Sequence, residues 1–524
     1  MAGVGIYFGS TSACLALFKN GRVEVLSDDS GERTTPTCVT LIGGEMLVGV
    51  PARQRLVRYP ESCLSNIKQF IGKQNFDLRS QLSSCDSQVQ HTAGNLSITL
   101  KNGNDSKQFG VLQLATAVFK KLRETAVSGG CSADSSIAAV VAAPSYFTCE
   151  QRQEIRSVAE SAGFAVLRVI SEPSAAVLAY GLLSVGQSDG ANSDSQCFVS
   201  CYVLVYHLGG SSLDLTILEY INGLYKVLTS QHITDLGGQL FDAALTDYFR
   251  QEFQRSARVE LEAGGQGIRK LQAVVENTKK ILSTLNQAAI AVDMLHEGMD
   301  FQSTISRARF EDLCAAEFIK CTQPIDDVMK TAEIEKSSIT YIVLSGGATR
   351  MPRIKQILKQ MFLNAEILES INPEEVVAQG AATEVGILLH DQLTDMSVDS
   401  TTQLDCAAHS FVAVVAGTDG ASPVIPIVSK QSLLPVTSKI TLDLSSQVRG
   451  EPTAILLYES ESCEKLVDER LIGEIKLQPN SDHRKSEDLT IELLSELTRQ
   501  CGLSVRVYNR STDETAELII PALS

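Results

Sequence analysis

The segment Ile339-Thr-Tyr-Ile-Val-Leu-Ser-Gly-Gly-Ala-Thr-Arg-Met-Pro352 decides the fold of this chain. It predicts a buried apolar strand that runs into Gly346 and Gly347 and straight on into a helix. Paired glycines let a flat ligand lie against bare backbone, and a helix N-terminus directs amide hydrogens and the positive end of the helix dipole at an anion. Alone, the segment fits an ordinary strand–turn–helix connection equally well.

Two upstream segments share a second pattern, in which an apolar strand, a turn of Gly, Ser and Thr, and another apolar strand follow one another. They are Gly5-Ile-Tyr-Phe-Gly-Ser-Thr-Ser-Ala-Cys14 and Val205-Tyr-His-Leu-Gly-Gly-Ser-Ser-Leu-Asp-Leu-Thr216. The pattern predicts a hairpin whose tip offers hydroxyl and amide groups to a ligand. Because two such hairpins lie about 200 residues apart, we expect a duplicated α/β fold with a cleft between its halves and one phosphate-binding loop from each.

With these segments, the chain resembles the seventy-kilodalton heat-shock protein family, whose ATPase domain has the actin-like two-lobed fold. Five further stretches keep the family's order between residues 4 and 390. They are Ala142-Ala-Pro-Ser-Tyr-Phe147 with Gln151-Arg152, Ile170-Ser-Glu-Pro-Ser-Ala-Ala176 with Ala179-Tyr-Gly181, Asp235-Leu-Gly-Gly238 with Phe241-Asp242, Arg307-Ala-Arg-Phe310, and Ser370-Ile-Asn-Pro-Glu374 with Gly380-Ala-Ala382. The resemblance implies a two-lobed α/β domain over residues 1–390 that binds ATP or ADP.

The composition changes after residue 390, and we expect a linker over residues 391–401. From residue 410 onward, apolar and polar residues alternate, which predicts about six to eight short strands. Clear examples are Ile440–Leu444, Leu489–Leu493 and Leu503–Val507. The resemblance implies that residues 402–524 form a small all-β, sandwich-like domain similar to the family's peptide-binding β subdomain, without its helical lid.

Hydrophobic periodicity also predicts two amphipathic helices and, between them, a strand buried on both faces over Ile137–Ala143. The apolar faces of the helices are Leu112, Ala115, Phe119, Leu122 and Ala126, and Ile268, Leu271, Val275, Thr278, Leu282 and Leu285. Another face of the second helix carries Glu276, Lys279 or Lys280, and Ser283. Spacing alone favours an exposed polar stripe there, whereas the resemblance implies that this face touches the adenosine. The polar stretch Ser184–Gln196 is expected to be a solvated insertion.

Composition limits the possible partners and compartments. The net charge is −17, and no run of five or more basic residues occurs, so strong direct binding to nucleic acid is not expected. Thirteen cysteines without CxxC pairs and only seven histidines favour buried thiols over a metal site. No apolar run reaches the roughly 18 residues of a membrane span, and the N-terminus has no signal-peptide pattern. We expect a reduced, cytosolic protein without a membrane partner.

The resemblance also shows where the chemistry departs from the family. Each phosphate hairpin of the family carries an Asp just before its Leu-Gly, and a Lys follows from the first lobe; here these positions hold Tyr7, His207 and Arg53. A phenol or an imidazole cannot replace a carboxylate toward Mg²⁺, so we expect Mg²⁺ to bind weakly if at all, and hydrolysis to be poor. Glu172 and Asp214 remain. The implied nucleotide-binding residues are Gly9, Ser10, Thr11, Arg53, Gly209, Gly210, Ser211, Ser212, Gly238, Glu276, Lys279, Lys280, Ser283, Gly346, Gly347, Arg350 and Glu374.

A damaged ATPase resembles the short, ribosome-associated members of the family. That resemblance implies a stable heterodimer with a J-domain co-chaperone, ribosome contact through that partner, and assistance to a catalytic heat-shock chaperone acting on nascent polypeptides. One alternative is an autonomous ATP-driven peptide chaperone. Another is a sugar-type kinase, which would need an Asp base in the cleft and a reason for the β domain. His207 could separately act as the base of a phosphotransferase, but no second base accompanies it.

Overall fold

The structure is a computed structural model of the 524-residue chain. It describes residues 2–72, 89–92, 95–102, 105–181, 200–221, 224–391, 410–416, 424–428, 436–443, 454–460, 470–476, 490–497, 503–509 and 514–520. The chain forms two compact units, the first mainly from residues before 401 and the second mainly from Thr401–Ser524. Among the helices of the described residues, none is long and apolar enough to cross a membrane.

The first unit opens with a mixed sheet in the order β12-β11-β1-β2-β3, with β4 beside β2. Its strands are β1 (Ala2–Phe8), β2 (Ser12–Lys19), β3 (Arg22–Val25), β4 (Thr34–Pro36), β11 (Ile137–Ala143) and β12 (Phe164–Ser171). Strand β11 lies parallel to both β1 and β12, and its apolar side chains are almost all buried. The predicted strand buried on both faces is therefore confirmed.

A second sheet repeats this arrangement in the order β15-β14-β13-β18-β19. Its strands are β13 (Ser200–Leu208), β14 (Ser212–Ile221), β15 (Leu224–Thr234), β18 (Ile339–Ser345) and β19 (Glu366–Leu368). In both sheets an antiparallel hairpin, β1–β2 or β13–β14, is followed by two parallel strands. This repeated order confirms the duplicated α/β fold that the two hairpin sequences predict.

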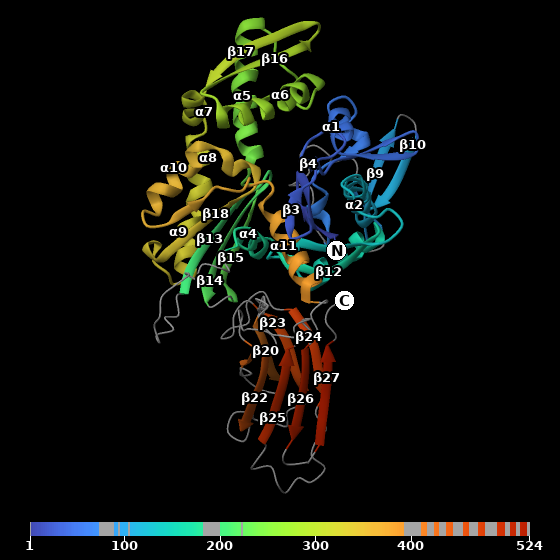
Figure 1. The fold of residues 1–524 in the computed structure, drawn as a ribbon, viewed down its shortest axis with the longest axis vertical. Helices are drawn as coiled ribbons and strands as arrows, with labels where there is room; N and C mark the ends of the chain where they lie inside the picture. Colours follow the sequence, from blue (N-terminus) through green and yellow to red (C-terminus); the bar gives the residue numbers. More distant parts are fainter. Residues whose placement is uncertain are drawn as a thin grey trace. The chain divides into compact units, whose positions relative to one another are not determined.

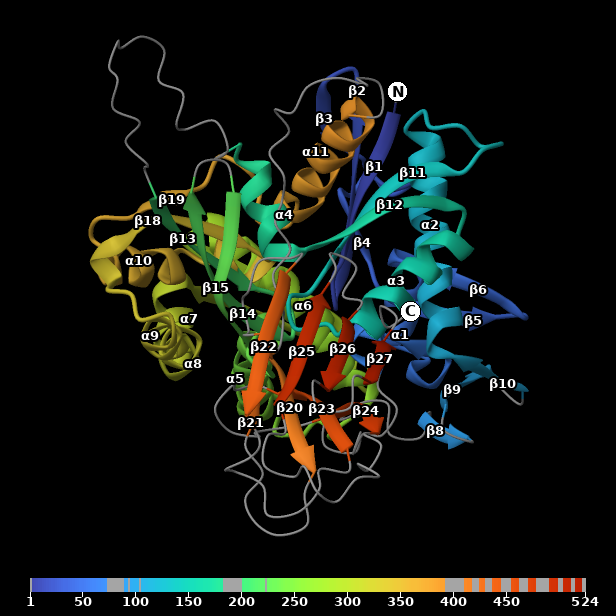
Figure 2. The same cartoon turned by 90° about the horizontal axis from the view of Figure 1, so that it is seen from below.

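Two helices, α4 (Glu172–Ala179) and α11 (Val376–Asp391), lie side by side next to these sheets (Figures 1 and 2). Helix α11 packs on β1, β2 and β11, while α4 contacts strands of both sheets. Their crossing is very close, because a Cβ on Gly380 would lie 1.7 Å from the carbonyl oxygen of Ala175. Glycine at this position lets the two helix backbones approach.

Further elements surround the first sheet. They are β5 (Val39–Ile42), β6 (Glu45–Val48), α1 (Val50–Leu56), η1 (Pro60–Ser62), β7 (Cys63–Leu64), η2 (Ile67–Phe70), β8 (Val89–Thr92), β9 (Asn95–Asn102), β10 (Asp105–Gly110), α2 (Val111–Ser128) and α3 (Cys149–Ser161). Helix α2 confirms the first predicted amphipathic helix. The prediction was wrong for Leu112, which was expected on the buried face but is 38% exposed. Val111 and Leu114 face the core instead.

The rest of the first unit surrounds the second sheet. The elements are α5 (Gly238–Ala257), α6 (Gln266–Thr284), β16 (Gln287–His296), β17 (Met299–Ser306), α7 (Arg307–Leu313), α8 (Ala315–Thr322), α9 (Pro324–Thr331), η5 (Lys336–Ser338), η6 (Gly347–Arg350) and α10 (Pro352–Met361). Helix α6 confirms the second predicted amphipathic helix. The prediction was wrong for Leu285, which was expected on the apolar face but lies just beyond the helix and is 59% exposed.

The second unit is built from two four-stranded antiparallel sheets, in the orders β21-β20-β23-β24 and β22-β25-β26-β27. Its strands are β20 (Ser410–Ala416), β21 (Val424–Val428), β22 (Val436–Asp443), β23 (Ala454–Ser460), β24 (Arg470–Lys476), β25 (Thr490–Leu497), β26 (Leu503–Asn509) and β27 (Glu514–Ile520). One apolar core takes side chains from both sheets, among them Ile455 and Val505. The expected sandwich-like β arrangement is confirmed. Residues 392–401 of the expected linker and the stretch Ser184–Gln196 lie outside the described residues.

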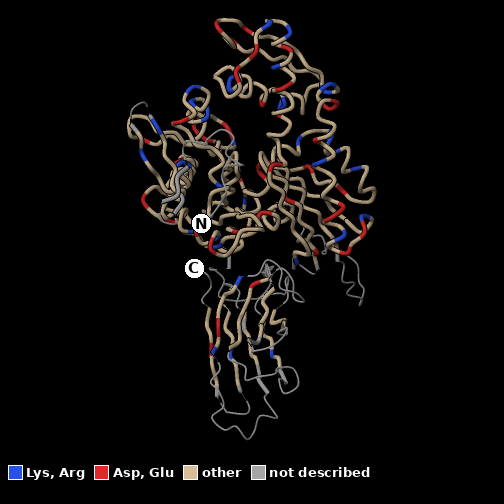
Figure 3. Tube along the Cα trace, turned by 180° about the vertical axis from the view of Figure 1, so that it is seen from behind, with Lys and Arg blue, Asp and Glu red and all other residues tan. Residues whose placement is uncertain are grey.

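Charged residues of both signs are interspersed along the described trace (Figure 3).

Candidate functional site

The two Gly/Ser/Thr hairpins have the same local geometry. The Gly9 amide donates to the Ser12 carbonyl oxygen at 3.0 Å, and the Gly209 amide donates to that of Ser212 at 2.9 Å. The turn residues between them are partly exposed and accessible to a ligand. The hairpin tips touch, because a Cβ on Gly210 would lie 2.3 Å from the methyl carbon of Thr11. The structure thus brings the predicted phosphate loops together.

Helix α5 begins against the second hairpin. The amide of Gly238 donates to the Gly209 carbonyl oxygen, and the amide of Gln239 to that of Gly210, each at 2.9 Å. These bonds satisfy two of the amides that a helix N-terminus leaves without helical partners. They also fix the hairpin at the positive end of the α5 dipole, where an anion bound by the turn would be stabilised.

The Gly346–Gly347 turn differs from the expectation in one respect. Strand β18 does end at Ser345, but the next element is the short 3-10 helix η6, and α10 begins only at Pro352. Proline fixes the backbone angle of a first helical residue and lacks an amide hydrogen, which accounts for the later start. The expectation that an α-helix begins directly at this turn was therefore wrong. The helix N-terminus at the site is that of α5.

Glu374 lies close to this turn, since a Cβ on Gly347 would stand 2.6 Å from its carboxylate oxygen. The carboxylate also accepts from Arg350 at 3.0 Å. Three of the predicted nucleotide-binding residues therefore lie together here, and a side chain at position 347 would require the Glu374 carboxylate to move.

Helix α6 presents the predicted adenosine face. Lys279 is the buried lysine: it donates to the Gly238 carbonyl oxygen at 2.9 Å and to Asp242 at 2.7 Å. Burial lowers the pKa of Lys279, and Asp242 partly offsets that shift. Lys280, with its side chain half exposed, pairs with Glu276 at 3.1 Å. Of the two lysines that the sequence left open, Lys279 therefore lies deeper in the site.

Arg53, on α1, pairs with Glu276 on α6, so it links an element near the first sheet to one near the second. The cation beside Tyr7 is instead Lys68. Its ammonium lies 5.6 Å from the centre of the Tyr7 ring and 2.5 Å from a carboxylate oxygen of Glu172. Both Lys68 and Glu172 are about 5% exposed. Sequence reasoning did not single out Lys68; the only signal was a lysine in the stretch Ile67–Ile71, which also holds Phe70.

Tyr7 and His207 face each other from the ends of β1 and β13. The phenol oxygen lies 3.4 Å from Nε2 of His207, and the hydroxyl of Ser345 lies 2.8 Å from its Nδ1. Because β13 and β18 are parallel neighbours with His207 opposite Ser345, the sheet register itself makes the second contact. Burial, followed by the nearby carboxylates Glu172 and Asp214, raises the pKa of Tyr7 well above its ordinary value. Tyr7 is therefore a neutral phenol.

Asp214 is held by protein groups on both oxygens. One accepts from Nδ1 of His232 at 2.6 Å, and the other from the Ser212 hydroxyl at 3.2 Å. The ring of Tyr146 stacks on His232 with 3.7 Å between ring centres. Burial acts to raise the pKa of Asp214, but the His232 hydrogen bond, with electrostatic interactions with His207, His232 and Lys68, brings it below its ordinary value. His232 and Tyr146 carried no sequence signal, because only the fold brings them to Asp214.

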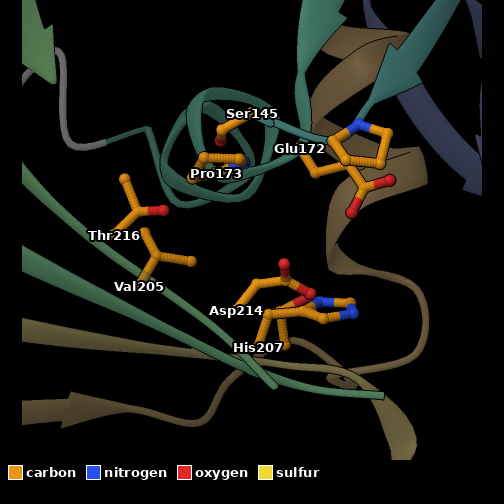
Figure 4. A pocket seen from close by; sticks show the side chains of 9 residues that line it. Ser145, Glu172, Pro173, Val205, His207, Asp214 and Thr216 are labelled. Carbon is orange, nitrogen blue, oxygen red and sulfur yellow. The ribbon is translucent and has the colours of Figure 1, made fainter. Parts of the chain in front are cut away.

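A small enclosed cavity joins these groups (Figure 4). It has room for about one water molecule. Its lining includes Glu172, His207, Asp214 and Ser345. Mg²⁺ prefers carboxylate oxygens and water. Across the part of the chain that the structure describes, no three His, Cys, Asp or Glu side chains are grouped so that they could hold a metal ion. The two carboxylates at this site, Glu172 and Asp214, are each already bonded to a protein group.

Two sheets of one strand order, each carrying a Gly/Ser/Thr hairpin into a shared site, fit the actin-like ATPase fold, whose members bind a nucleotide. The family model described as Hsp70 protein matches residues 3–455. Heat shock 70 kDa protein 14 of Mus musculus is 33% identical over 528 residues, covering all of both chains, and that of Danio rerio is 37% identical over 78% of this chain and 79% of its own. Heat shock 70 kDa protein 2 of Paracoccidioides lutzii is 33% identical over 99% of this chain and 76% of its own. The chain belongs to the seventy-kilodalton heat-shock protein family, a family of chaperones that bind ATP and ADP.

Proposed function

We propose that this chain is a nucleotide-binding chaperone homologue with little or no ATP hydrolysis, whose actin-like domain closes as two lobes on its ligand. The observation that carries the proposal is the Tyr7–His207 contact, at the positions where the resemblance expects two metal-organising carboxylates. Catalysis of phosphoryl transfer to water depends largely on positioning and on charge neutralisation by Mg²⁺. A phenol and an imidazole that bond to each other leave no anionic ligands there for the ion.

The amide-rich part of the site supports binding without turnover. Both hairpins keep their closed turns, and α5 keeps its N-terminus against the second hairpin. Glycine still occupies the positions where a side chain would collide, such as Gly210 and Gly347. Nucleotide binding is therefore proposed to persist although the metal-organising groups are replaced.

The cellular role that we propose is that of a partner subunit. The chain would pair with a J-domain co-chaperone, reach the cytosolic ribosome through it, and assist a catalytic heat-shock chaperone in folding nascent polypeptides. A β domain over residues 402–524, joined by the linker at 391–401, would hold a segment of that partner. With a net charge of −17, the chain gains little from direct contact with ribosomal RNA, so the partner would supply the basic surface.

Capture of the tagged full-length chain from cytosol, followed by ribosome fractionation, tests this role. We expect a J-domain protein in stoichiometric amount and loss of ribosome association when that protein is depleted. Salt-resistant ribosome binding by the purified chain alone would contradict the partner model, because the contact would then belong to the chain itself.

One observation favours the alternative of an autonomous ATP-driven peptide chaperone: a buried cation, Lys68, and two carboxylates, Glu172 and Asp214, lie at the site. Steady ATP turnover, together with release of bound peptide on addition of ATP, would support that alternative over the partner model.

A further inference from the structure

The rings of Tyr7 and His207 fill the space between the first glycines of the two phosphate hairpins. A Cβ on Gly9 would lie 2.9 Å from the phenol oxygen of Tyr7, and one on Gly209 would lie 3.3 Å from Nε2 of His207. The two ring tips are themselves 3.4 Å apart. At 9% and 7% exposure, neither ring is a solvated side chain that can simply swing away. The inner end of the phosphate site is therefore occupied by the protein.

This inner end lies away from the nucleoside side of the site. The predicted adenosine residues lie on α6, which reaches the hairpins through Lys279 and Gly238. A nucleotide whose nucleoside lies at α6 extends its phosphate chain toward the hairpins, so its last phosphate goes deepest. A second phosphate would reach the outer turn residues, whereas a third would meet the Tyr7 and His207 rings.

The charges at this inner end also oppose a third phosphate. Glu172 and Asp214 both line the adjacent cavity. The hydrogen bond from His232 keeps the Asp214 carboxylate ionised, and Lys68, whose ammonium lies over the Tyr7 ring, already pairs with Glu172. One more negative charge placed about 10 Å from a carboxylate, taken by itself, lowers affinity roughly tenfold at an effective dielectric constant of about 20.

From these contacts we infer that the site selects a nucleoside diphosphate over a nucleoside triphosphate, with Tyr7 and His207 as the residues that determine this selectivity. The inference rests on the proposed nucleotide binding and adds the class of nucleotide. In this inference, Tyr7 and His207 shorten the phosphate site in addition to replacing carboxylates that would bind a metal.

Isothermal titration of the purified full-length chain with ADP, ATP and the non-hydrolysable analogue adenylyl imidodiphosphate tests the inference, once with Mg²⁺ and once with EDTA. We expect ADP to bind at least about tenfold more tightly than either triphosphate under both conditions. Tyr7→Ala combined with His207→Ala opens the space, so we expect the ADP to ATP affinity ratio to fall toward one. Tyr59→Ala is the matched control, because that ring is 55% exposed and stacks under Arg55 outside the site.

The outcomes distinguish failure of the diphosphate selectivity from failure of nucleotide binding itself. Triphosphate affinity equal to or above that of ADP in the unmodified chain overturns the inference and leaves nucleotide binding intact. An unchanged ratio in a folded double variant overturns the assignment to Tyr7 and His207. Failure of all three nucleotides to bind contradicts the proposed nucleotide binding and the inference with it. If the double variant does not fold, the ratio measured for the unmodified chain still decides the selectivity.

Discussion

The phenol oxygen of Tyr7 lies 3.4 Å from Nε2 of His207, although the two residues are 200 positions apart in the sequence. One comes from the first sheet and the other from the second, so the contact joins the two repeats of the fold at their phosphate hairpins. At this point a phenol and an imidazole stand at the two positions where the resemblance expects metal-organising carboxylates.

The first prediction follows from treating the two positions as one unit. Tyr7→Asp together with His207→Asp is expected to recover some Mg²⁺-dependent ATP hydrolysis, whereas either single change is not, because one carboxylate facing a ring cannot organise the ion. Steady-state phosphate release by the three variants measures this. Equal recovery by a single substitution and by the pair would show that the positions act independently.

The second prediction compares two substitutions at the nucleotide site. Gly347→Val is expected to lower ADP affinity at least about tenfold, because a side chain there meets Glu374. Arg53→Ala is expected to cost about fivefold or less, since its side chain is 41% exposed and surface ion pairs contribute little. Titration of both variants with ADP provides the measurement, with melting temperatures as the folding control. An equal loss of ADP affinity in the two variants would contradict the claim that glycine at position 347 matters more for binding than the Arg53 side chain.

The third prediction concerns the buried pair of Lys68 and Glu172. Removal of one partner leaves an unpaired buried charge, so Lys68→Met is expected to lower the free energy of unfolding by about 3–5 kcal/mol. Lys68→Met combined with Glu172→Gln is expected to cost less than the sum of the two single changes. Urea denaturation of the four proteins in this cycle measures the coupling. Strictly additive losses would show that the pair is not coupled in the folded protein.

The fourth prediction is a pH dependence at Asp214. Its pKa lies below the ordinary value in the folded chain, so the carboxylate stabilises the fold above the unfolded pKa of about 3.9, and this stabilisation is lost as the pH falls through the folded pKa. The stability difference between the unmodified chain and Asp214→Asn is therefore expected to shrink on acidification below about pH 5. Urea unfolding over a pH series measures it. A difference that stays constant or grows in acid would argue against an ionised, hydrogen-bonded Asp214.

Most of the architecture could be predicted because it depends on local patterns. The hairpin turns, α2, α6, β11 and the alternating strands of the second unit all follow from periodicity and from Gly, Ser and Thr at turns. The exceptions lie at element ends, where Pro352 delays a helix and Leu285 falls outside one.

The interior of the candidate site could be predicted only in part. Tyr7 and His207 stand out against the resemblance, but Ser345 meets His207 because of strand register, and His232 reaches Asp214 only through the fold. Lys68 was missed because the resemblance directed attention to Arg53, whereas the cation that contacts Glu172 in the structure is Lys68. Such partners depend on tertiary packing, which no spacing in the sequence encodes.

The most direct test of the central claim is a single experiment on the full-length chain, purified free of other chaperones. Nucleotide binding is measured by titration, and phosphate release is then followed with Mg²⁺ at a concentration of ATP that the titration shows to be saturating. The account predicts bound nucleotide and no phosphate release above the rate without protein. Steady turnover at a rate comparable to that of an active family member would contradict it.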